Sequence, residues 1–375
     1  MKFIIIRLLT ILLFFSIFIS CKNIKEKESI NLKVSTKSSI KYAKGFNIEY
    51  FETYKKLIVN APYQNSNETF EFILIDKNST KKGIKTPINS IVVTSTTHIP
   101  MLELLEVENK LIGYPNTDYI SSKKTRSLIN TGTIKELGNE ENINTELLLD
   151  LNPEVVVGFS ISSNNKMFAT IENLGIPVVL NGDWLEETPL GRAEWIKFFG
   201  VLFDKEKLAD SIFNEIENNY LSAKNVALKS ELKPTIISGG LFKDIWNLPA
   251  GDSFEATFLK DANTNYLWAN SDGKGSLSLN IENVFEKGKN ADIWISPSFY
   301  TSIFNIEKAN DLYSKFKAFK NKQVYSFVNK KGEKGGITYF ELAPARPDLV
   351  LKDLIKIAHP ELLIDYEFTF FEKLN

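Results

Sequence analysis

The chain has 375 residues, of which 43% are hydrophobic and 12% aromatic, so it is long enough for about two domains with sizeable buried cores. Its 45 Lys and Arg residues balance its 46 Asp and Glu residues, so no positive excess attracts nucleic acid, and we expect no nucleic-acid partner. Two histidines and one cysteine nearly exclude a multi-histidine metal centre, a zinc ribbon and an internal disulfide framework.

The first twenty residues predict an export signal rather than a part of the fold. Lys2 and Arg7 supply positive charge, and residues 8–19 form an almost unbroken apolar run that is short for a membrane span. Ser20 stands directly before Cys21, and this pair resembles a bacterial lipoprotein cleavage site. We therefore predict a signal peptide over residues 1–20 and lipidation of Cys21. The alternative is a simple signal peptide with an incidental cysteine.

The next stretch predicts a tether and then a small antiparallel sheet. Residues 21–37 are polar and rich in lysine, which is typical of a flexible tether. Between residues 38 and 89, runs of alternating or β-branched residues separated by turn residues predict a β meander. The predicted strands of this meander are 47–51, 56–59 and 70–75.

From Ser90 onward the pattern changes to strands that alternate with helices. Such buried runs, bounded by Gly and Pro, predict a parallel sheet covered on both faces. The predicted strands are 91–94, 111–113, 154–158 and 176–180, and the predicted helices are 99–105, 145–151 and 164–173.

The alternation stops at two helices and then resumes. Residues 189–203 predict one helix, and Asp204 is positioned to cap a second that runs to about residue 230. A helix of that length spans about 38 Å, which suggests a bridge between two lobes; the alternative is a long surface helix on one domain. Strands follow at 235–238, 292–295 and 324–327, with a late helix over 348–358.

The predicted fold class is therefore α/β, with two Rossmann-like lobes joined by a long rigid helix. The predicted boundaries are residues 38–190 for the first lobe, including the meander over 38–89, residues 191–230 for the linking helices, and residues 231–375 for the second lobe. The two lobes also repeat a unit: Glu146 and Glu282 each open a short helix that leads to a buried strand.

Read in order, these segments resemble the class III substrate-binding proteins of ABC transporters, which capture ferric siderophores, haem or cobalamin. The resemblance extends from about residue 90 to residue 363 and does not cover residues 22–89 well. Its segments are 111–113, 144–146, 151–156 and 174–178 in the first lobe, and 261–263, 281–284, 291–295, 346–349 and 359–361 in the second.

The resemblance implies transport without chemistry. It implies a monomer, lipid-anchored in the periplasm, that holds a metal chelate, most simply a ferric siderophore, and delivers it to an ABC permease and its ATPase. No cofactor and no bound bare metal are implied. In this family one glutamate per lobe pairs with arginines of the permease, and the matching positions are Glu146 and Glu282. The alternative is that both only stabilise helix N-termini.

Ligands of open α/β sheets sit beyond the carboxyl ends of the strands, so residues just after the predicted strands are the candidates. Aromatic faces supply contact area for a chelate, and an arginine holds carboxylates. The predicted ligand-binding residues are Thr97, His98, Tyr114, Trp184, Trp246, Tyr339 and Arg346. Each has an alternative: the aromatics could be core, His98 a polar loop residue, and Arg346 a support for the next helix.

Two further residues are interpreted as structural. His359 ends the late helix before Pro360, and Arg192 is expected to pair with nearby acids. The sequence has no G-x-S-x-G elbow, no Walker loop and no G-x-G-x-x-G fingerprint, so we predict no enzymatic activity. The alternatives are cobalamin or haem binding on the same fold, or, in another class, an exported hydrolase or structural lipoprotein.

Overall fold

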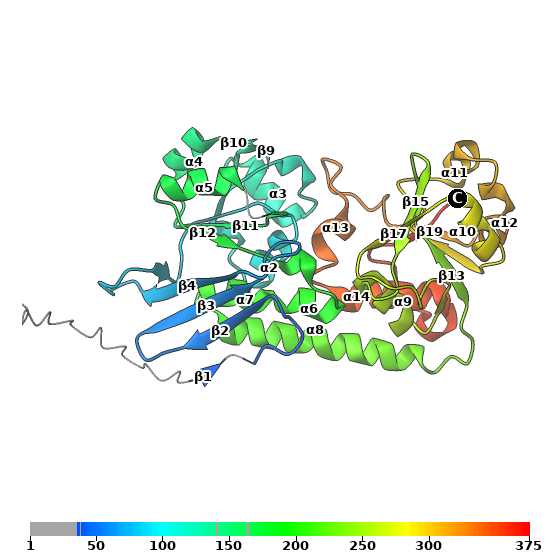
Figure 1. The fold of residues 1–375 in the computed structure, drawn as a ribbon, viewed down its shortest axis with the longest axis horizontal. Helices are drawn as coiled ribbons and strands as arrows, with labels where there is room; N and C mark the ends of the chain where they lie inside the picture. Colours follow the sequence, from blue (N-terminus) through cyan, green and yellow to red (C-terminus); the bar gives the residue numbers. More distant parts are fainter. Residues whose placement is uncertain (1–35, 38, 140–141, 163–164) are drawn as a thin grey trace, which may run out of the picture. The chain divides into compact units, whose positions relative to one another are not determined.

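The fold is built around two sheets formed by separate halves of the chain (Figure 1). The computed structural model describes residues 36–37, 39–139, 142–162 and 165–375. The predicted signal peptide and Cys21 lie outside the described residues. Among the helices of the described ranges, none is both long and apolar enough to cross a bilayer.

The first lobe, as we name it, surrounds a five-stranded sheet in which every pair of neighbours is parallel. In order of pairing its strands are β12 (Val178–Leu180), β11 (Val155–Gly158), β6 (Ile91–Val93), β7 (Leu111–Tyr114) and β8 (Lys135–Glu136). Its helices are α2 (His98–Leu104), α3 (Lys123–Asn130), α4 (Thr145–Leu151) and α5 (Lys166–Asn173), with a small hairpin of β9 (Gly138–Asn139) and β10 (Asn142–Ile143) and the short 3₁₀ helices η1 (Glu108–Lys110), η2 (Thr117–Tyr119) and η3 (Asp183–Leu185).

This sheet is buried on both faces, as predicted from its β-branched runs. Val155 and Val157 pack in the core that contains α2, whereas Val156 between them packs with Leu148 of α4 and Ile171 of α5. Successive side chains of a strand point to opposite faces, so a strand covered on both sides must be apolar at every position. The continuous apolar run of β11 is the consequence.

The second lobe surrounds a sheet whose order is β16 (Asn265–Tyr266), β13 (Thr235–Ser238), β18 (Ile293–Ile295), β19 (Val324–Ser326) and β20 (Glu372–Lys373). The first four strands are parallel, and β20 joins antiparallel. A three-stranded sheet of β14 (Gly240–Phe242), β15 (Ile245–Pro249) and β17 (Ser276–Leu279) lies in the same lobe. Its helices are α9 (Phe254–Asp261), α10 (Ile281–Gly288), α11 (Ile303–Ala309), α12 (Lys317–Lys320), α13 (Thr338–Leu342) and α14 (Pro347–Ala358), with η4 (Tyr313–Lys315) and η5 (Pro360–Leu363).

The predicted meander is present as a separate sheet that packs on the first lobe. Its strands pair in chain order, as β1 (Thr36–Lys37), β2 (Phe46–Tyr50), β3 (Tyr54–Asn60), β4 (Thr69–Asp76) and β5 (Ile84–Thr86). The first four are antiparallel, as predicted, whereas β5 joins β4 in parallel. Phe46 and Leu57 from this sheet are buried in one core with Trp195 and Phe198. The sheet thus completes the first lobe's core rather than forming a domain with a core of its own.

Three helices link the lobes: α6 (Pro189–Glu194), α7 (Ile196–Leu202) and α8 (Glu206–Ala227). The single predicted helix over 189–203 is interrupted at Trp195. Asp204 was predicted to cap α8, but it does not. It adopts a left-handed conformation before the helix and pairs with Lys55 at 2.8 Å. The N-cap position belongs to Lys205.

One apolar stripe of α8 enters both cores. Ala209, Phe213 and Ile216 pack in the core of the first lobe, and Tyr220 and Ala223 pack in the core of the second. These positions recur every three or four residues, as they must to share one face of a helix. At 1.5 Å per residue the 22 residues of α8 span about 33 Å. Helix α8 is therefore the common support of both lobes.

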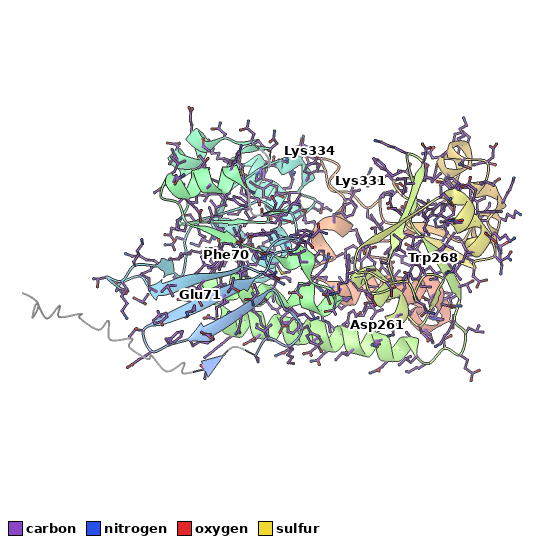
Figure 2. All side chains as sticks on the ribbon, in the orientation of Figure 1. Phe70, Glu71, Asp261, Trp268, Lys331 and Lys334 are labelled. Carbon is purple, nitrogen blue, oxygen red and sulfur yellow. The ribbon has the colours of Figure 1, made fainter. Side chains whose placement is uncertain are left out.

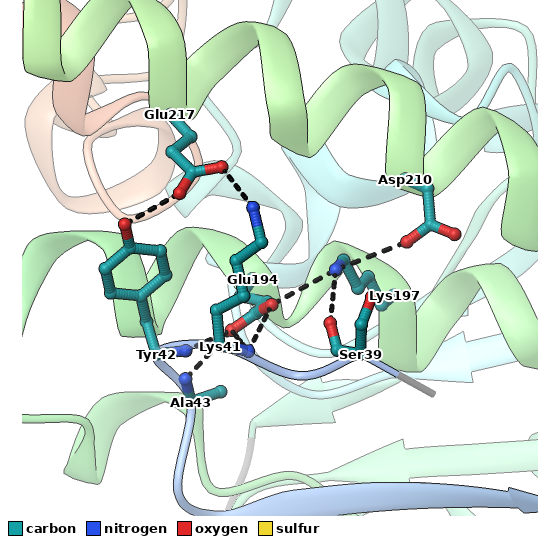
Figure 3. Close-up of polar contacts among 8 residues, drawn as sticks. All are labelled: Ser39, Lys41, Tyr42, Ala43, Glu194, Lys197, Asp210 and Glu217. Carbon is teal, nitrogen blue, oxygen red and sulfur yellow. Dashed lines mark hydrogen bonds and ion pairs between the residues drawn. The ribbon is translucent and has the colours of Figure 1, made fainter. Parts of the chain in front are cut away.

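Residues 39–45, which we call the N-terminal strap, are bound to the linking helices by buried carboxylates (Figure 3). Glu194 of α6 accepts the main-chain N–H groups of Lys41 (2.9 Å), Tyr42 (2.7 Å) and Ala43 (3.0 Å). Lys197 also pairs with Glu194, at 3.1 Å. A carboxylate buried among these donors replaces the water that each main-chain group loses.

Two more glutamates hold the same segment. Glu186 accepts the N–H groups of Lys44 (2.9 Å) and Gly45 (2.8 Å), so the two carboxylates bind five consecutive amides. On α8, Glu217 accepts hydrogen bonds from Lys41 Nζ (2.8 Å) and the Tyr42 hydroxyl (2.7 Å). The chain that emerges from the predicted tether is thus fixed to the linking helices.

We predict that Glu194→Gln lowers the free energy of unfolding by about 2–4 kcal/mol, because the amide offers one acceptor oxygen to a set of donors and removes the more buried of the two carboxylates that pair with Lys197. Chemical denaturation monitored by tryptophan fluorescence measures the change. Glu231→Gln, at an exposed position, is the matched control and is expected to change stability by less than about 0.5 kcal/mol. Equal stability of the two variants would contradict the role of the strap.

Candidate functional site

The larger of two neighbouring cavities opens at the carboxyl ends of the second lobe's strands. Its volume is about 420 Å³. Gly239 follows β13, Ser296 follows β18 and Phe327 follows β19, and all three line it. This is the edge at which ligands of parallel sheets bind. Ser296 and Ser298 both adopt left-handed conformations, φ 54° and 53°, a backbone strain that concentrates at functional sites.

The smaller cavity, of about 160 Å³, lies between the lobes. Thr97 of the first lobe and Arg192 of α6 line one part of it, and residues of α9, α13 and the start of α14 line the rest. Thr97 is held in place by a hydrogen bond from its hydroxyl to Asp183, at 2.8 Å. The second lobe contributes Phe254, Glu255, Phe258, Tyr339, Phe340, Ala343, Pro344 and Pro347.

The two cavities adjoin, because Glu255, Phe258 and Tyr339 line both. The ring of Tyr339 stacks on Phe327, with 4.3 Å between centroids and an interplanar angle of 11°. The stack holds the ring of Tyr339 in place where the larger and the smaller cavity meet. Burial raises the pKa of Tyr339, so its hydroxyl keeps its proton and can donate a hydrogen bond.

Arg192 and Glu255 give the smaller cavity its charge. The guanidinium of Arg192 donates to the main-chain oxygens of Glu186 (3.2 Å) and Trp184 (2.8 Å) and lies 3.5 Å from the ring centroid of Phe254. Burial lowers the pKa of Arg192, and burial raises the pKa of Glu255, an effect that the charge of Arg192 opposes. Arg192 was expected to pair with acids; its hydrogen bonds go instead to carbonyl oxygens.

Of the predicted ligand residues, Thr97 and Tyr339 line the cavities. Trp184 is partly exposed and lies beside Arg192, whose guanidinium bonds to its main-chain oxygen, but it does not line either cavity.

The structure places three other predicted ligand residues in the protein core, which corrects their prediction. Trp246, with no exposed surface, stacks on Trp294 at 5.4 Å and donates its indole N–H to the Ser238 carbonyl at 2.9 Å. Tyr114 and His98 are also fully buried. His98 begins α2 with its ring against the first lobe's core, and burial lowers its pKa, so the ring is neutral at pH 7. Residues without surface do not contact a ligand.

Arg346 is likewise not brought to the cavities. Its guanidinium binds both carboxylate oxygens of the buried Asp348, at 2.9 and 2.8 Å, just where Pro347 starts α14. This is the alternative that the sequence offered. His359 ends α14, buried, with Nε2 3.1 Å from the Ala262 carbonyl, which agrees with its structural interpretation.

Sequence reasoning missed several lining residues. Phe254 and Glu255 begin α9 and Phe258 lies one turn further on, after a strand, β15, that was not predicted from the sequence. The signal was available as Ser253, whose hydroxyl accepts the Ala256 N–H at 3.1 Å and caps the helix. A recognised cap would have placed the aromatic and acidic side chains of this first turn beside the cleft.

The glutamates predicted to dock on a permease occupy equivalent positions. Glu146 lies in the first turn of α4, capped by Asn144, and Glu282 lies in the first turn of α10, capped by Asn280; both glutamates are exposed. Within the described ranges, no group of three or more His, Cys, Asp or Glu side chains is arranged to hold a metal ion.

Known proteins share this architecture. The sequence model described as periplasmic binding protein matches residues 91–330. Lipoprotein MJ0878 of Methanocaldococcus jannaschii is 27% identical in an alignment that covers 94% of this chain and 90% of that protein.

Two solved structures resemble the fold at low sequence identity. A possible iron-binding (periplasmic solute-binding) protein from Staphylococcus epidermidis has a TM-score of 0.58 at 21% identity, covering 73% of this chain and 100% of that one. The periplasmic heme binding protein HutB of Vibrio cholerae has a TM-score of 0.55 at 16% identity, covering 70% and 99%. The predicted two-lobed α/β fold and the predicted family resemblance are confirmed.

We predict that Trp246→Phe lowers the free energy of unfolding by about 1–3 kcal/mol, because it removes a buried hydrogen bond and leaves a space in the core. Denaturant titration measures the loss. Trp184→Phe, at a partly exposed position, is the control and is expected to cost less. A Trp246→Phe variant of unchanged stability would contradict the core position of this side chain.

Proposed function

Because the chain belongs to the periplasmic binding protein family, we propose that it captures a metal chelate, in the first place a ferric siderophore, and delivers it to an ABC permease and its ATPase. The observation that carries this proposal is the pair of adjoining cavities, one at the strand ends of the second lobe and one between the lobes. Aromatic walls with a few polar groups are typical of small-molecule sites.

The lining of the cavities suits a chelate. Phe242 and Phe299, which line the larger cavity, are 62% and 63% exposed, so a ligand with an apolar rim gains contact area there. Arg192 presents a cation to the smaller cavity, where it suits carboxylate, phenolate or hydroxamate oxygens. The hydroxyls of Ser296, Ser298 and Tyr339 add hydrogen-bonding groups.

Iron is the metal we favour, and haem is the second candidate. The similar protein from Staphylococcus epidermidis is described as a possible iron-binding protein, and the one from Vibrio cholerae as a heme binding protein. Cobalamin is a further candidate, because the same aromatic and cationic groups suit it. The alternatives from another class are an exported hydrolase and a structural lipoprotein. A hydrolase would release a product, and a structural lipoprotein would bind none of these ligands.

The location follows from the first residues of the chain. We propose that Cys21 is lipidated after removal of residues 1–20, and that a monomer is held at the membrane surface in the periplasm by that anchor. The description of MJ0878 as a lipoprotein supports this proposal. Two or more acyl chains bind a membrane stably, since each buried methylene contributes about 0.8 kcal/mol.

Mass spectrometry of the natively isolated protein tests the proposed ligand class. We expect an iron-containing small molecule to accompany the chain. Titration of the stripped protein with ferric siderophores, haem and cobalamin, followed by quenching of tryptophan fluorescence, then identifies the ligand. Trp184→Phe is expected to diminish the quenching, because Trp184 is partly exposed and its main-chain oxygen binds Arg192, which lines the smaller cavity. No response to any of these ligands would favour the other class.

We predict that Arg192→Gln weakens binding of an anionic chelate by about 10- to 100-fold, the size expected for loss of a charged hydrogen bond. Fluorescence titration measures the affinity. Denaturation of the same variant checks that the protein remains folded without the guanidinium contacts of Arg192. Arg126→Gln, at a buried arginine that does not line these cavities, is the control for loss of a cation. Unchanged affinity in Arg192→Gln would contradict the assigned role.

We predict that the double variant Glu146→Lys and Glu282→Lys abolishes uptake of the ligand by whole cells while its affinity stays unchanged, because both carboxylates are proposed to pair with permease cations. The control carries Asp150→Lys and Glu286→Lys, which place the same charge changes at exposed positions further along α4 and α10. Normal uptake by the first variant, or equal loss in both, would remove the docking role.

A further inference from the structure

Helix α9 of the second lobe carries two acidic residues, and the protein supplies partners for one of them. Asp261, at the end of the helix and labelled in Figure 2, accepts a hydrogen bond from the Tyr220 hydroxyl (2.8 Å) and pairs with Lys224 at 2.7 Å. Glu255 lies in the first turn. Among the residues that the structure describes, none donates a hydrogen bond to the Glu255 carboxylate or forms an ion pair with it.

Glu255 lies where the two cavities meet, since it lines both and keeps part of its surface exposed. Water can solvate the carboxylate there until a ligand that extends from the larger cavity into the smaller one displaces it. A carboxylate that loses water without gaining a donor weakens binding. A ligand that fills both cavities must therefore bring a donor for Glu255.

The helix that carries Glu255 does not by itself explain the residue. A carboxylate in a first turn meets the helix dipole favourably, but the gain is modest, and Ser253 already caps α9. The dipole and the guanidinium of Arg192 favour the ionised form of Glu255, whereas burial raises its pKa. An ammonium group beside the carboxylate would add to the first two effects and favour the ionised form.

The charges around the smaller cavity leave a negative excess. Arg192 is the one cation among the described residues that line it, and the charges of Asp183, Glu255 and Glu186 all act on its guanidinium. Asp183 accepts the Thr97 hydroxyl, and Glu186 accepts main-chain N–H groups of the strap. Arg192 itself donates to carbonyl oxygens. The group that the site lacks is thus a cation for Glu255.

We propose that Glu255 selects a chelate that carries a protonated amine, with the ammonium group bound at Glu255 and the acidic oxygens of the chelate at Arg192. This inference rests on the proposed function, because it names the class of chelate that the two cavities accept. The rings of Phe258 and Tyr339 line the same cavities, and aromatic rings attract ammonium groups. A chelate without the amine would leave a desolvated carboxylate unpaired, which is a strong basis for rejection.

Two ferric chelates that differ in one amine test the proposal. Ferrioxamine B is a trihydroxamate with a terminal ammonium group, and acetylation of that amine removes the charge but leaves the iron-binding groups unchanged. We expect the wild-type protein, stripped of bound molecules, to bind ferrioxamine B about 10- to 100-fold more tightly than its N-acetyl derivative, the size expected for a charged hydrogen bond. Isothermal titration calorimetry measures both affinities.

Two variants assign the preference to one side chain. Glu255→Gln keeps the size of the residue and removes its charge, so it is expected to bring the two affinities within about threefold of each other. Glu307→Gln, at an exposed position on α11 that lines neither cavity, is the matched control and is expected to keep the wild-type preference. If Glu255→Gln does not fold, the wild-type comparison of the two chelates decides.

Equal affinity of the wild-type protein for the two compounds, tighter binding of the acetylated one, or a preference kept by Glu255→Gln would overturn the proposal. If neither compound binds, the molecule carried by the natively isolated protein is treated with the N-hydroxysuccinimide ester of acetic acid, which acetylates primary amines. A gain in its mass supports the proposal, and an unchanged mass overturns it.

The same measurement separates this inference from the proposed function. A carried metal chelate without an amine would overturn the selection by Glu255 and leave the proposed function intact. A carried molecule with the amine but without a metal would contradict the proposed function and leave the role of Glu255 intact. A protein that carries no molecule and binds neither compound would contradict both.

Discussion

Every other feature of the molecule depends on one apolar stripe of α8 that is buried in two separate cores. Its first half, with Phe213, packs in the first lobe, and its second half, with Tyr220, packs in the second. A helix held in this way cannot bend without exposing apolar surface in one lobe, so it fixes how far the lobes can move. Other contacts add to this support at the same place: the strap binds α6 and α8 through Glu194 and Glu217, and Arg192 reaches from α6 to Phe254.

The fold was largely predictable because its signals are local. β-branched runs identified strands such as Val155–Gly158, and three- and four-residue spacing identified α8. The predicted helix boundaries were wrong where a residue distant in sequence decides the local structure. Asp204 does not occupy the predicted N-cap position of α8 and instead pairs with Lys55 from the added sheet. The strap was not predictable at all, since Glu194 and Tyr42 lie 152 residues apart and no local pattern relates them.

The candidate site was predicted in part, and burial explains the difference. The rule that ligands sit beyond strand ends pointed to the edge of the sheet at which the larger cavity opens, and the predicted Tyr339 lines both cavities. The same rule does not separate side chains that turn outward from those that turn into the core, which is why Trp246 and Tyr114 were misassigned. Glu255 was missed because its helix was not recognised.

The central claim is that a metal chelate occupies the cavities that meet at Tyr339. X-ray diffraction at the iron absorption edge, on crystals of the natively isolated protein, measures this directly, because anomalous scattering locates iron without assuming what surrounds it. We expect one iron peak inside the cavities, beside Tyr339 and Arg192. A ligand that contains no metal, or iron bound elsewhere on the protein while these cavities stay filled by side chains or solvent, would contradict the account.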